Sequence, residues 1–123
     1  MQRSKKADRD PAGAGFRRGV ELFNQGEFWH AHEAWEAEWL TTTGDRAQFL
    51  QGLIQLAAAC YHVQKGNDRG AAKLRKISLQ RLGSLPDGYG GVALGELCAQ
   101  ASLGTWEGVE DIQALRVRYV EPS

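Results

Sequence analysis

The feature that most constrains this chain is a helical spacing of apolar residues, which glycine-containing breaks interrupt several times. Phe16, Val20 and Phe23 recur at i, i+4 and i+7 and therefore share one face of a helix. Asp10 is a candidate N-cap for this helix, and Gly26 is a candidate C-cap. The same pattern predicts further helices over about 27–40, 46–64, 68–82 and 92–101. One more helical turn is expected near 109–115, and the alternation of residues 116–120 fits an extended segment.

A weak internal repeat indicates how these helices are arranged. Residues 22–35 align with residues 62–75 at an offset of 40, so that Gly26 falls on Gly66 and Ala31 on Ala71. The pattern predicts an all-α fold of two stacked antiparallel helical hairpins with tetratricopeptide-like packing, followed by a short C-terminal helix and tail. We expect a flexible N-terminal arm over residues 1–11 and a single helical domain over residues 12–123.

Composition is that of a globular protein without a membrane anchor. Of 123 residues, 42% are hydrophobic and 24% are charged. No apolar run approaches the roughly 20 residues that cross a bilayer, and the charged N-terminus lacks the apolar core of a secretion signal. Cys60 and Cys98 lie in apolar patterns without CxxC spacing, so we interpret them as reduced core residues. These features predict a cytoplasmic protein with no membrane partner.

Charge is unevenly distributed along the chain, although its sum is zero. Residues 1–18 carry +4, residues 19–45 carry −6, residues 46–82 carry +6 and residues 83–123 carry −4. Residues 19–45 contain no Lys or Arg. Either an acidic hairpin packs beside a basic one, or each hairpin presents a recognition face.

The stretch "FWHAHEAWEAEW", residues 28–39, concentrates the side chains that could carry chemistry. Its apolar residues recur at helical spacing, which is more typical of a core face than of a ligand cage. They are Phe28, Ala31, Trp35 and Trp39. His32 lies four residues before Glu36, with Glu33 beside it, so these polar groups flank the apolar stripe.

The helix over 46–64 adds further polar groups that would meet this flank. The six groups are His32, Glu33, Glu36, Gln51, Gln55 and His62. One interpretation is a hydrogen-bond network that fixes how the hairpins pack. The other is a divalent-metal site with His32, Glu36 and His62 as ligands, or acid–base chemistry with Glu33 and Glu36 as catalytic candidates. Because HExxH is absent and no spacing demands a metal, the residues favour no cofactor over a metal.

Other classes of chemistry find little support. No Ser lies in a GxSxG motif, and "GYGG" at residues 88–91 follows no predicted strand, so a phosphate-binding loop is not expected. Arg69, Lys73 and Lys76 form a basic stripe at helical spacing. Zero net charge and the lack of interleaved aromatic residues favour a solvated face over a nucleic-acid site.

The segments "FNQGEFWHAHEAWEAEW" and "FLQGLIQLAAACYHVQKGNDRGAAKL" closely resemble the DUF309 family of small bacterial and archaeal proteins. The family pattern is an F-N-x-G-x-[YF] turn, an A-H-E-x-W-E-x-x-W helix, an F-x-Q-G-L-I-Q helix and a G-N-x-x-G-A turn. The resemblance covers about residues 16–82 and implies an all-helical domain with no known activity. It also implies that six polar residues belong to the family signature: His32, Glu33, Glu36, Gln51, Gln55 and Asn67.

The sequence therefore favours a protein-interaction or structural module that self-associates or binds another protein. Its support is the hairpin architecture, the charge asymmetry and the lack of an evident nucleophile. The alternative is a small metal-dependent or acid–base enzyme that uses the cluster of His32, Glu33 and Glu36.

Overall fold

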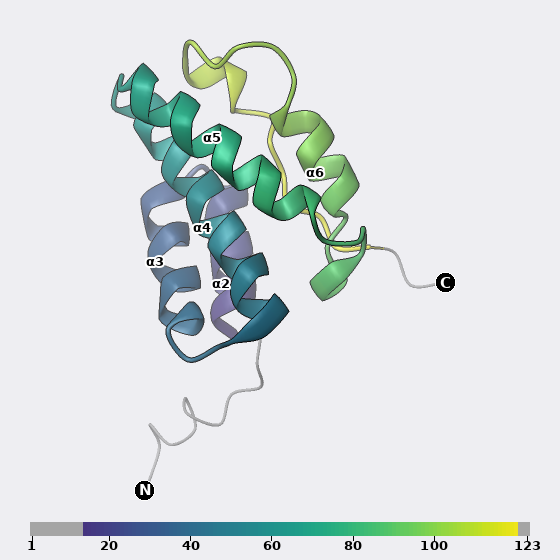
Figure 1. Ribbon diagram of the computed structural model, residues 1–123. Helices are drawn as coiled ribbons and strands as arrows, with labels where there is room; N and C mark the ends of the chain where they lie inside the picture. Colours follow the sequence, from purple (N-terminus) through teal and green to yellow (C-terminus); the bar gives the residue numbers. More distant parts are fainter. Residues whose placement is uncertain (1–13, 121–123) are drawn as a thin grey trace, which may run out of the picture.

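The computed structural model describes residues 14–120, and helices form most of this range (Figure 1). The α-helices are α2 (Ala14–Asn24), α3 (Phe28–Trp39), α4 (Gly44–Gln64), α5 (Asp68–Gly83) and α6 (Leu94–Ala101). Two short 3-10 helices follow in the C-terminal part, η1 (Tyr89–Gly91) and η2 (Val109–Asp111). No strand occurs between residues 14 and 120, and the predicted all-α fold is confirmed. The expected arm over residues 1–11, with the candidate N-cap Asp10, lies outside the described range.

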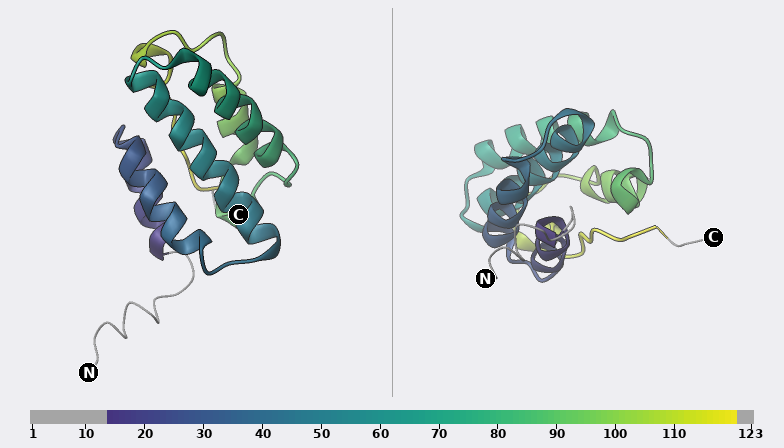
Figure 2. Two further views of the ribbon diagram at one scale, coloured as in Figure 1. Left: turned by 60° about the vertical axis from the view of Figure 1, so that its left-hand side comes forward. Right: turned by 90° about the horizontal axis from the view of Figure 1, so that it is seen from below.

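The helices form a row of three with one helix behind each end. Consecutive helices pack against each other, and α3, α4 and α5 lie side by side (Figure 2). In the left view of Figure 2, α2 lies behind α3 and α6 lies behind α5, so α4 occupies the middle of the row. Helix α4 begins at Gly44 rather than at the predicted Arg46, because Thr43 is extended at the N-cap and Asp45 favours a first helical turn.

The two glycine turns of the internal repeat have the same structure. Gly26 and Gly66 have φ of 82° and 76°, a region that favours glycine because it has no Cβ. In the first turn, Glu27 N donates to Leu22 O at 2.9 Å. In the second turn, Asn67 N donates to His62 O at 2.8 Å. Both residues of this bond follow those of the first turn at the same offset of 40. Both antiparallel hairpins, α2–α3 and α4–α5, therefore begin their second helix from the same backbone geometry.

Trp35 holds the first hairpin together. Its side chain is fully buried, its ring packs 5.8 Å from that of Phe23, and its Nε1 donates to Phe16 O at 2.9 Å. A Cβ added at Gly19 would collide with the indole ring, so this glycine allows α2 to approach α3 closely. The predicted apolar stripe of α3 is largely confirmed, because Phe28, Ala31 and Trp35 are buried and Trp39 is partly buried.

The residues after α6 return across the back of the molecule as an extended segment. Val92 and Tyr119 form an antiparallel bridge, as the alternation of residues 116–120 suggested. Asn24 at the end of α2 pairs with the backbone of Val117: Asn24 Nδ2 donates to Val117 O at 3.0 Å, and Val117 N donates to Asn24 Oδ1 at 2.8 Å. Since the chain covers its own back in this way, the outward side of the α3–α4–α5 row is left for other contacts.

The cysteines agree with a core role. Both Cys60 and Cys98 are free, and Cys60 is fully buried. Burial in an apolar environment raises the pKa of the Cys60 thiol far above its usual range, so the thiolate is not formed in the folded protein at neutral pH. Within residues 14–120, none of the helices combines the length and the apolarity that crossing a bilayer would require.

Candidate interaction surface

Three of the predicted site residues have structural partners on the second hairpin. Arg81 Nε donates to Gln55 Oε1 at 3.0 Å, which links α5 to α4. Asn67 is the N-cap of α5 and accepts from Gly70 N at 3.0 Å. The Nδ2 of Asn67 also donates to His62 Nδ1 at 3.1 Å, so the imidazole of His62 is engaged at the α4–α5 turn.

The candidates on α3 behave differently. Glu33 and Glu36 are exposed to solvent. His32 stacks on Trp29, with ring centroids 4.9 Å apart and planes inclined by 13°, and its buried Nδ1 has no hydrogen-bond partner in the described part of the chain. Nor does any hydrogen bond within residues 14–120 join His32, Glu33 or Glu36 to the polar residues of α4. The structure thus separates the expected groups. Gln55, His62 and Asn67 are bonded on α4–α5, whereas no hydrogen bond within residues 14–120 engages the side chain of Gln51 or of the three residues on α3.

The expected metal ligands are not brought together in residues 14–120. No group of three His, Cys, Asp or Glu side chains in this range has an arrangement that could hold a metal ion. His32 and Glu36 share a face of α3, whereas His62 lies at the other side of α4, against the start of α5. The physical reason is that α4 presents His62 toward Asn67 rather than toward α3.

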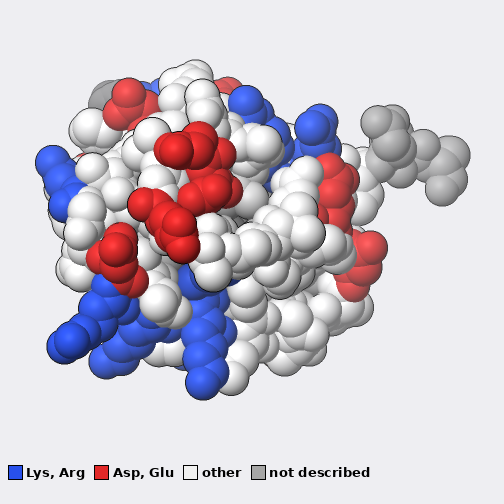
Figure 3. Space-filling view, turned by 90° about the horizontal axis from the view of Figure 1, so that it is seen from above, with Lys and Arg blue, Asp and Glu red and all other residues white. Residues whose placement is uncertain are grey.

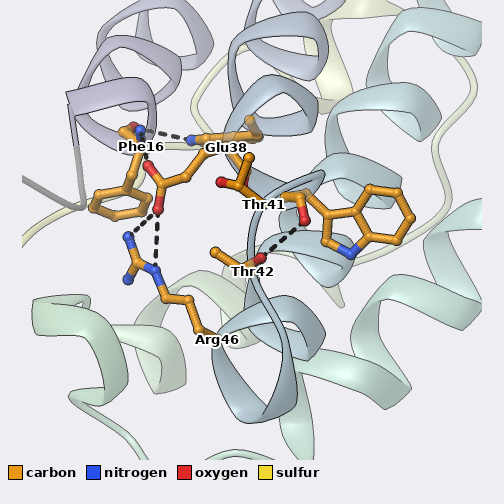
Figure 4. A network of polar contacts seen from close by, with 7 residues as sticks. Phe16, Glu38, Thr41, Thr42 and Arg46 are labelled. Atoms are coloured by element: carbon orange, nitrogen blue, oxygen red, sulfur yellow. Dashed lines mark hydrogen bonds and ion pairs between the residues drawn. The ribbon is translucent and has the colours of Figure 1, made fainter. Parts of the chain in front are cut away.

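An ion pair that the sequence analysis missed connects the first three helices (Figure 4). Glu38 Oε2 accepts from Arg46 Nη2 at 2.8 Å and from Nε at 3.2 Å, while Glu38 Oε1 accepts from Phe16 N at 3.0 Å. The exposed fraction is only 11% for the Glu38 side chain and 26% for the Arg46 side chain. The Arg46 guanidinium lies 5.2 Å from the ring centre of Phe16 and 5.4 Å from that of Phe49.

This network stabilises the packing of the helices and leaves little of Glu38 free for a ligand. Its carboxylate satisfies a backbone N–H in the first turn of α2, where a helix favours negative charge. A signal was present in the sequence, because Arg46 is the only Lys or Arg between residues 19 and 64. A lone cation within an acidic region is a natural partner for one of its carboxylates.

The basic residues of α5 divide into bonded and free ones. Arg75 Nε donates to Ala101 O at 2.8 Å, and its Nη2 donates to Leu103 O at 3.0 Å, which satisfies carbonyl groups at the end of α6. Arg75 also lies 4.6 Å above the ring centre of Trp106, and partial burial lowers the pKa of its guanidinium. Arg69, Lys73 and Lys76 are exposed and form none of the ion pairs found in residues 14–120.

The outward side of the α3–α4–α5 row, here called the three-helix face, combines these free groups. Its α3 ridge consists of Trp29, Glu33, Glu36 and Leu40. Its α5 ridge consists of the exposed residues Arg69, Lys73, Lys76 and Gln80 along the far edge of the row, where Lys76 also lines a groove with Ser102 and Gly104 after α6. Between them lies the α4 strip of partly exposed Gln51, Gln55, Ala58 and Tyr61. The exposed fraction is 43% for Trp29 and 71% for Leu40, large values for apolar side chains.

Charged side chains form small groups on the surface. Seen from above, one group of Lys and Arg side chains lies at the lower left and one group of Asp and Glu side chains near the centre, and smaller groups of both signs lie elsewhere in this view (Figure 3). The ion pairs of the described chain involve neither Glu33 nor Glu36, nor any member of the α5 ridge. The three-helix face therefore has an acidic side and a basic side that are not neutralised within the described part of the molecule.

A concave pocket of about 290 Å³ lies elsewhere, between the α2–α3 turn and η2. Its walls include the buried rings of Phe23 and Phe28, and its polar groups include Gln64, Gln113 and Arg116. It contains no His, Asp or Glu. The pocket thus lacks groups for general acid–base chemistry, and the α3 candidates lie outside it.

Comparisons with known proteins agree with the resemblance noted in the sequence. The chain is 34% identical over 88 residues to an uncharacterized protein of Aquifex aeolicus (strain VF5). The matched region is 69% of this chain but only 26% of that relative, so the chain spans about a quarter of the relative's length. The family model described as "Domain of unknown function (DUF309)" matches residues 16–74, which contain most of α2, all of α3 and α4, and the first part of α5. Over most of its first two hairpins, the chain therefore resembles the DUF309 family.

Proposed function

We propose that this chain is a protein-interaction module and that the three-helix face is its binding surface. The observation that carries the proposal is the exposed indole of Trp29. Tryptophan is strongly enriched among the residues that dominate binding energy, and an indole held on a surface loses little conformational freedom on binding. Trp29 is held in this way by stacking on His32 and by packing 5.0 Å from the ring of Tyr61.

The surroundings of Trp29 have the composition of an interface. Glu33 and Glu36 continue the α3 ridge and would set the orientation of a charged partner. Leu40, which directly follows α3 and lies eleven residues after Trp29, adds a second exposed apolar side chain. The two free thiols support action in a reducing compartment, such as the cytoplasm.

A photo-reactive amino acid at position 33, in cells that naturally express the protein, tests this proposal. We expect a cross-linked protein adduct, because Glu33 lies in the middle of the α3 ridge. The matched control places the same amino acid at Glu21, which is exposed on α2 outside the three-helix face. An adduct at position 33 and none at position 21 supports the proposal. Equal adducts at both positions, or none at either, contradict it.

One observation favours a second function, in which His32, Glu33 and Glu36 carry metal-dependent or acid–base chemistry. His32 Nδ1 is buried and lacks a hydrogen-bond partner within residues 14–120, and such groups are uncommon away from functional sites. Metal content of untagged protein, measured by mass spectrometry beside His32→Ala and Glu36→Ala, tests it. We expect far less than one metal ion per chain, because the ligands are not assembled. One ion per chain, lost in both variants, would instead support the enzyme.

A further inference from the structure

We infer that the partner of the three-helix face is a second copy of this chain, docked across a twofold axis that runs parallel to α4. This inference rests on the proposed function and names its partner. It uses three properties of the face: the order of its helices, the charges on its two ridges and the lack of charge on the strip between them.

The order of the helices determines what such an axis brings together. In the row, α3 and α5 lie on the two sides of α4 (Figure 2). A twofold axis that lies in the interface, parallel to α4, exchanges the two sides of the row but leaves the height of each residue along the helices unchanged. Two equivalent contacts therefore form, each between α3 of one copy and α5 of the other. Between them, the two copies of α4 face each other. This is a closed and self-complementary contact, the commonest kind in homo-oligomers.

The charges on the two ridges are complementary in this arrangement. Glu33 and Glu36 are the charged members of the α3 ridge, and they have no ion-pair partner in the described part of the chain. The α5 ridge carries three cations and no acid: Arg69, Lys73 and Lys76. Both contacts between α3 and α5 in the dimer thus join acidic side chains to basic ones.

The spacing of these charges along the helices is also matched. The offset of 40 that relates the two hairpins pairs Trp29 with Arg69, Glu33 with Lys73, Glu36 with Lys76 and Leu40 with Gln80. The helices α3 and α5 run in the same direction, and both begin near the C-terminal end of α4. There Trp29 packs on Tyr61, and Asn67 bonds to His62. Both helices rise about 1.5 Å per residue. The carboxylates of α3 and the ammonium groups of α5 therefore lie at similar heights along the face.

The α4 strip suits a position on the axis. At a twofold axis each side chain meets its own copy, so a charge there would face a like charge. Helix α4 contains no Asp, Glu, Lys or Arg between residues 47 and 64. Ala58 in the middle of the strip is small enough to allow two helices to approach closely.

The face has the size of a small specific interface. Three helices at about 9 Å spacing, contacting over about three to four turns because α3 has 12 residues, cover on the order of 500–600 Å² per partner. Specific interfaces begin at about 600 Å² per partner. Zero net charge means that two copies do not repel each other overall.

The mass of the full chain in solution, measured by light scattering at about 50 µM and low salt, is the first readout. We expect twice the chain mass of 13.6 kDa. Reversing the α3 charges (Glu33→Lys with Glu36→Lys) or the α5 charges (Lys73→Glu with Lys76→Glu) should weaken the dimer about 100-fold or more, since like charges then face each other at both contacts. A control with the same charge change, Glu21→Lys with Glu110→Lys, should leave the dimer unchanged.

The decisive measurement mixes the two reversed variants. Each is expected to be monomeric alone, but together they restore opposite charges at both contacts and should form a heterodimer. A monomeric wild type, or reversed variants that dimerise as the wild type does, overturns the inference. If the wild type is monomeric while position 33 cross-links to a different protein, the interaction module stands and only the identity of its partner is wrong. If position 33 yields no adduct beyond the control, the proposed function fails as well.

Discussion

Replacing Trp35 with alanine is expected to lower the free energy of unfolding by about 3–5 kcal/mol, a large part of the stability of a single domain. The indole is fully buried between α2 and α3, and its loss would leave a cavity that the backbone cannot fill. The substitution also removes the hydrogen bond from Trp35 Nε1 to Phe16 O, which joins the two helices. The buried carbonyl of Phe16 would then lack this donor.

Chemical denaturation followed by far-UV circular dichroism measures this effect. The matched control is Trp29→Ala, the same change at a position on the same helix that is 43% exposed. We expect the control to cost about 1 kcal/mol, because the side chain loses packing on His32 and Tyr61 but leaves no buried cavity. Equal losses in the two variants would show that Trp35 is not the centre of the first hairpin.

Glu38→Ala is expected to lower the free energy of unfolding by about 2–3 kcal/mol. Removing one partner of a buried ion pair costs about 3–5 kcal/mol, and the partial exposure of Arg46 reduces that value here. The variant leaves a cation with no carboxylate partner and a backbone N–H of Phe16 without its acceptor. The effect arises from packing between helices and is therefore independent of any binding partner.

A double-mutant cycle with Arg46→Ala separates the contribution of the pair from the other contacts of each residue. We expect a coupling energy of about 1–2 kcal/mol between Glu38 and Arg46. Glu36→Ala, which removes an exposed carboxylate two residues earlier on the same helix, should change stability by less than about 0.5 kcal/mol. A coupling near zero, or an equal loss in Glu36→Ala, would contradict the role assigned to Glu38.

The candidate site was only partly predictable, and the reason is visible in α3. The helical spacing correctly assigned Trp35 to the core, because its position relative to Phe28 and Ala31 depends only on the local helix geometry. The spacing placed His32, Glu33 and Glu36 beside this stripe, but it contained no information on what the neighbouring helix would present to them. The structure shows Gln55 bonded to Arg81 instead, across 26 residues of sequence.

The interpretation of the charge asymmetry had to wait for the arrangement of the helices. From the sequence, the acidic and basic segments could have neutralised each other within the molecule. In the structure, Glu38 and Arg46 do so, whereas the charges of the α3 and α5 ridges are held apart by α4. The sequence likewise did not distinguish Trp29 from the other aromatic residues of its helix, because only the structure shows that its side chain is exposed.

The sequence by itself determined the secondary structure and the hairpins. Apolar spacing at i, i+4 and i+7 selects helices, and Gly26 and Gly66 end them because a positive φ favours glycine. These are local effects, which a few neighbouring residues decide. Only the tertiary structure decided which polar groups meet, as when Asn24 holds the backbone of Val117 from 93 residues away. Such contacts depend on the relative placement of whole helices, which side-chain packing selects and local spacing does not encode.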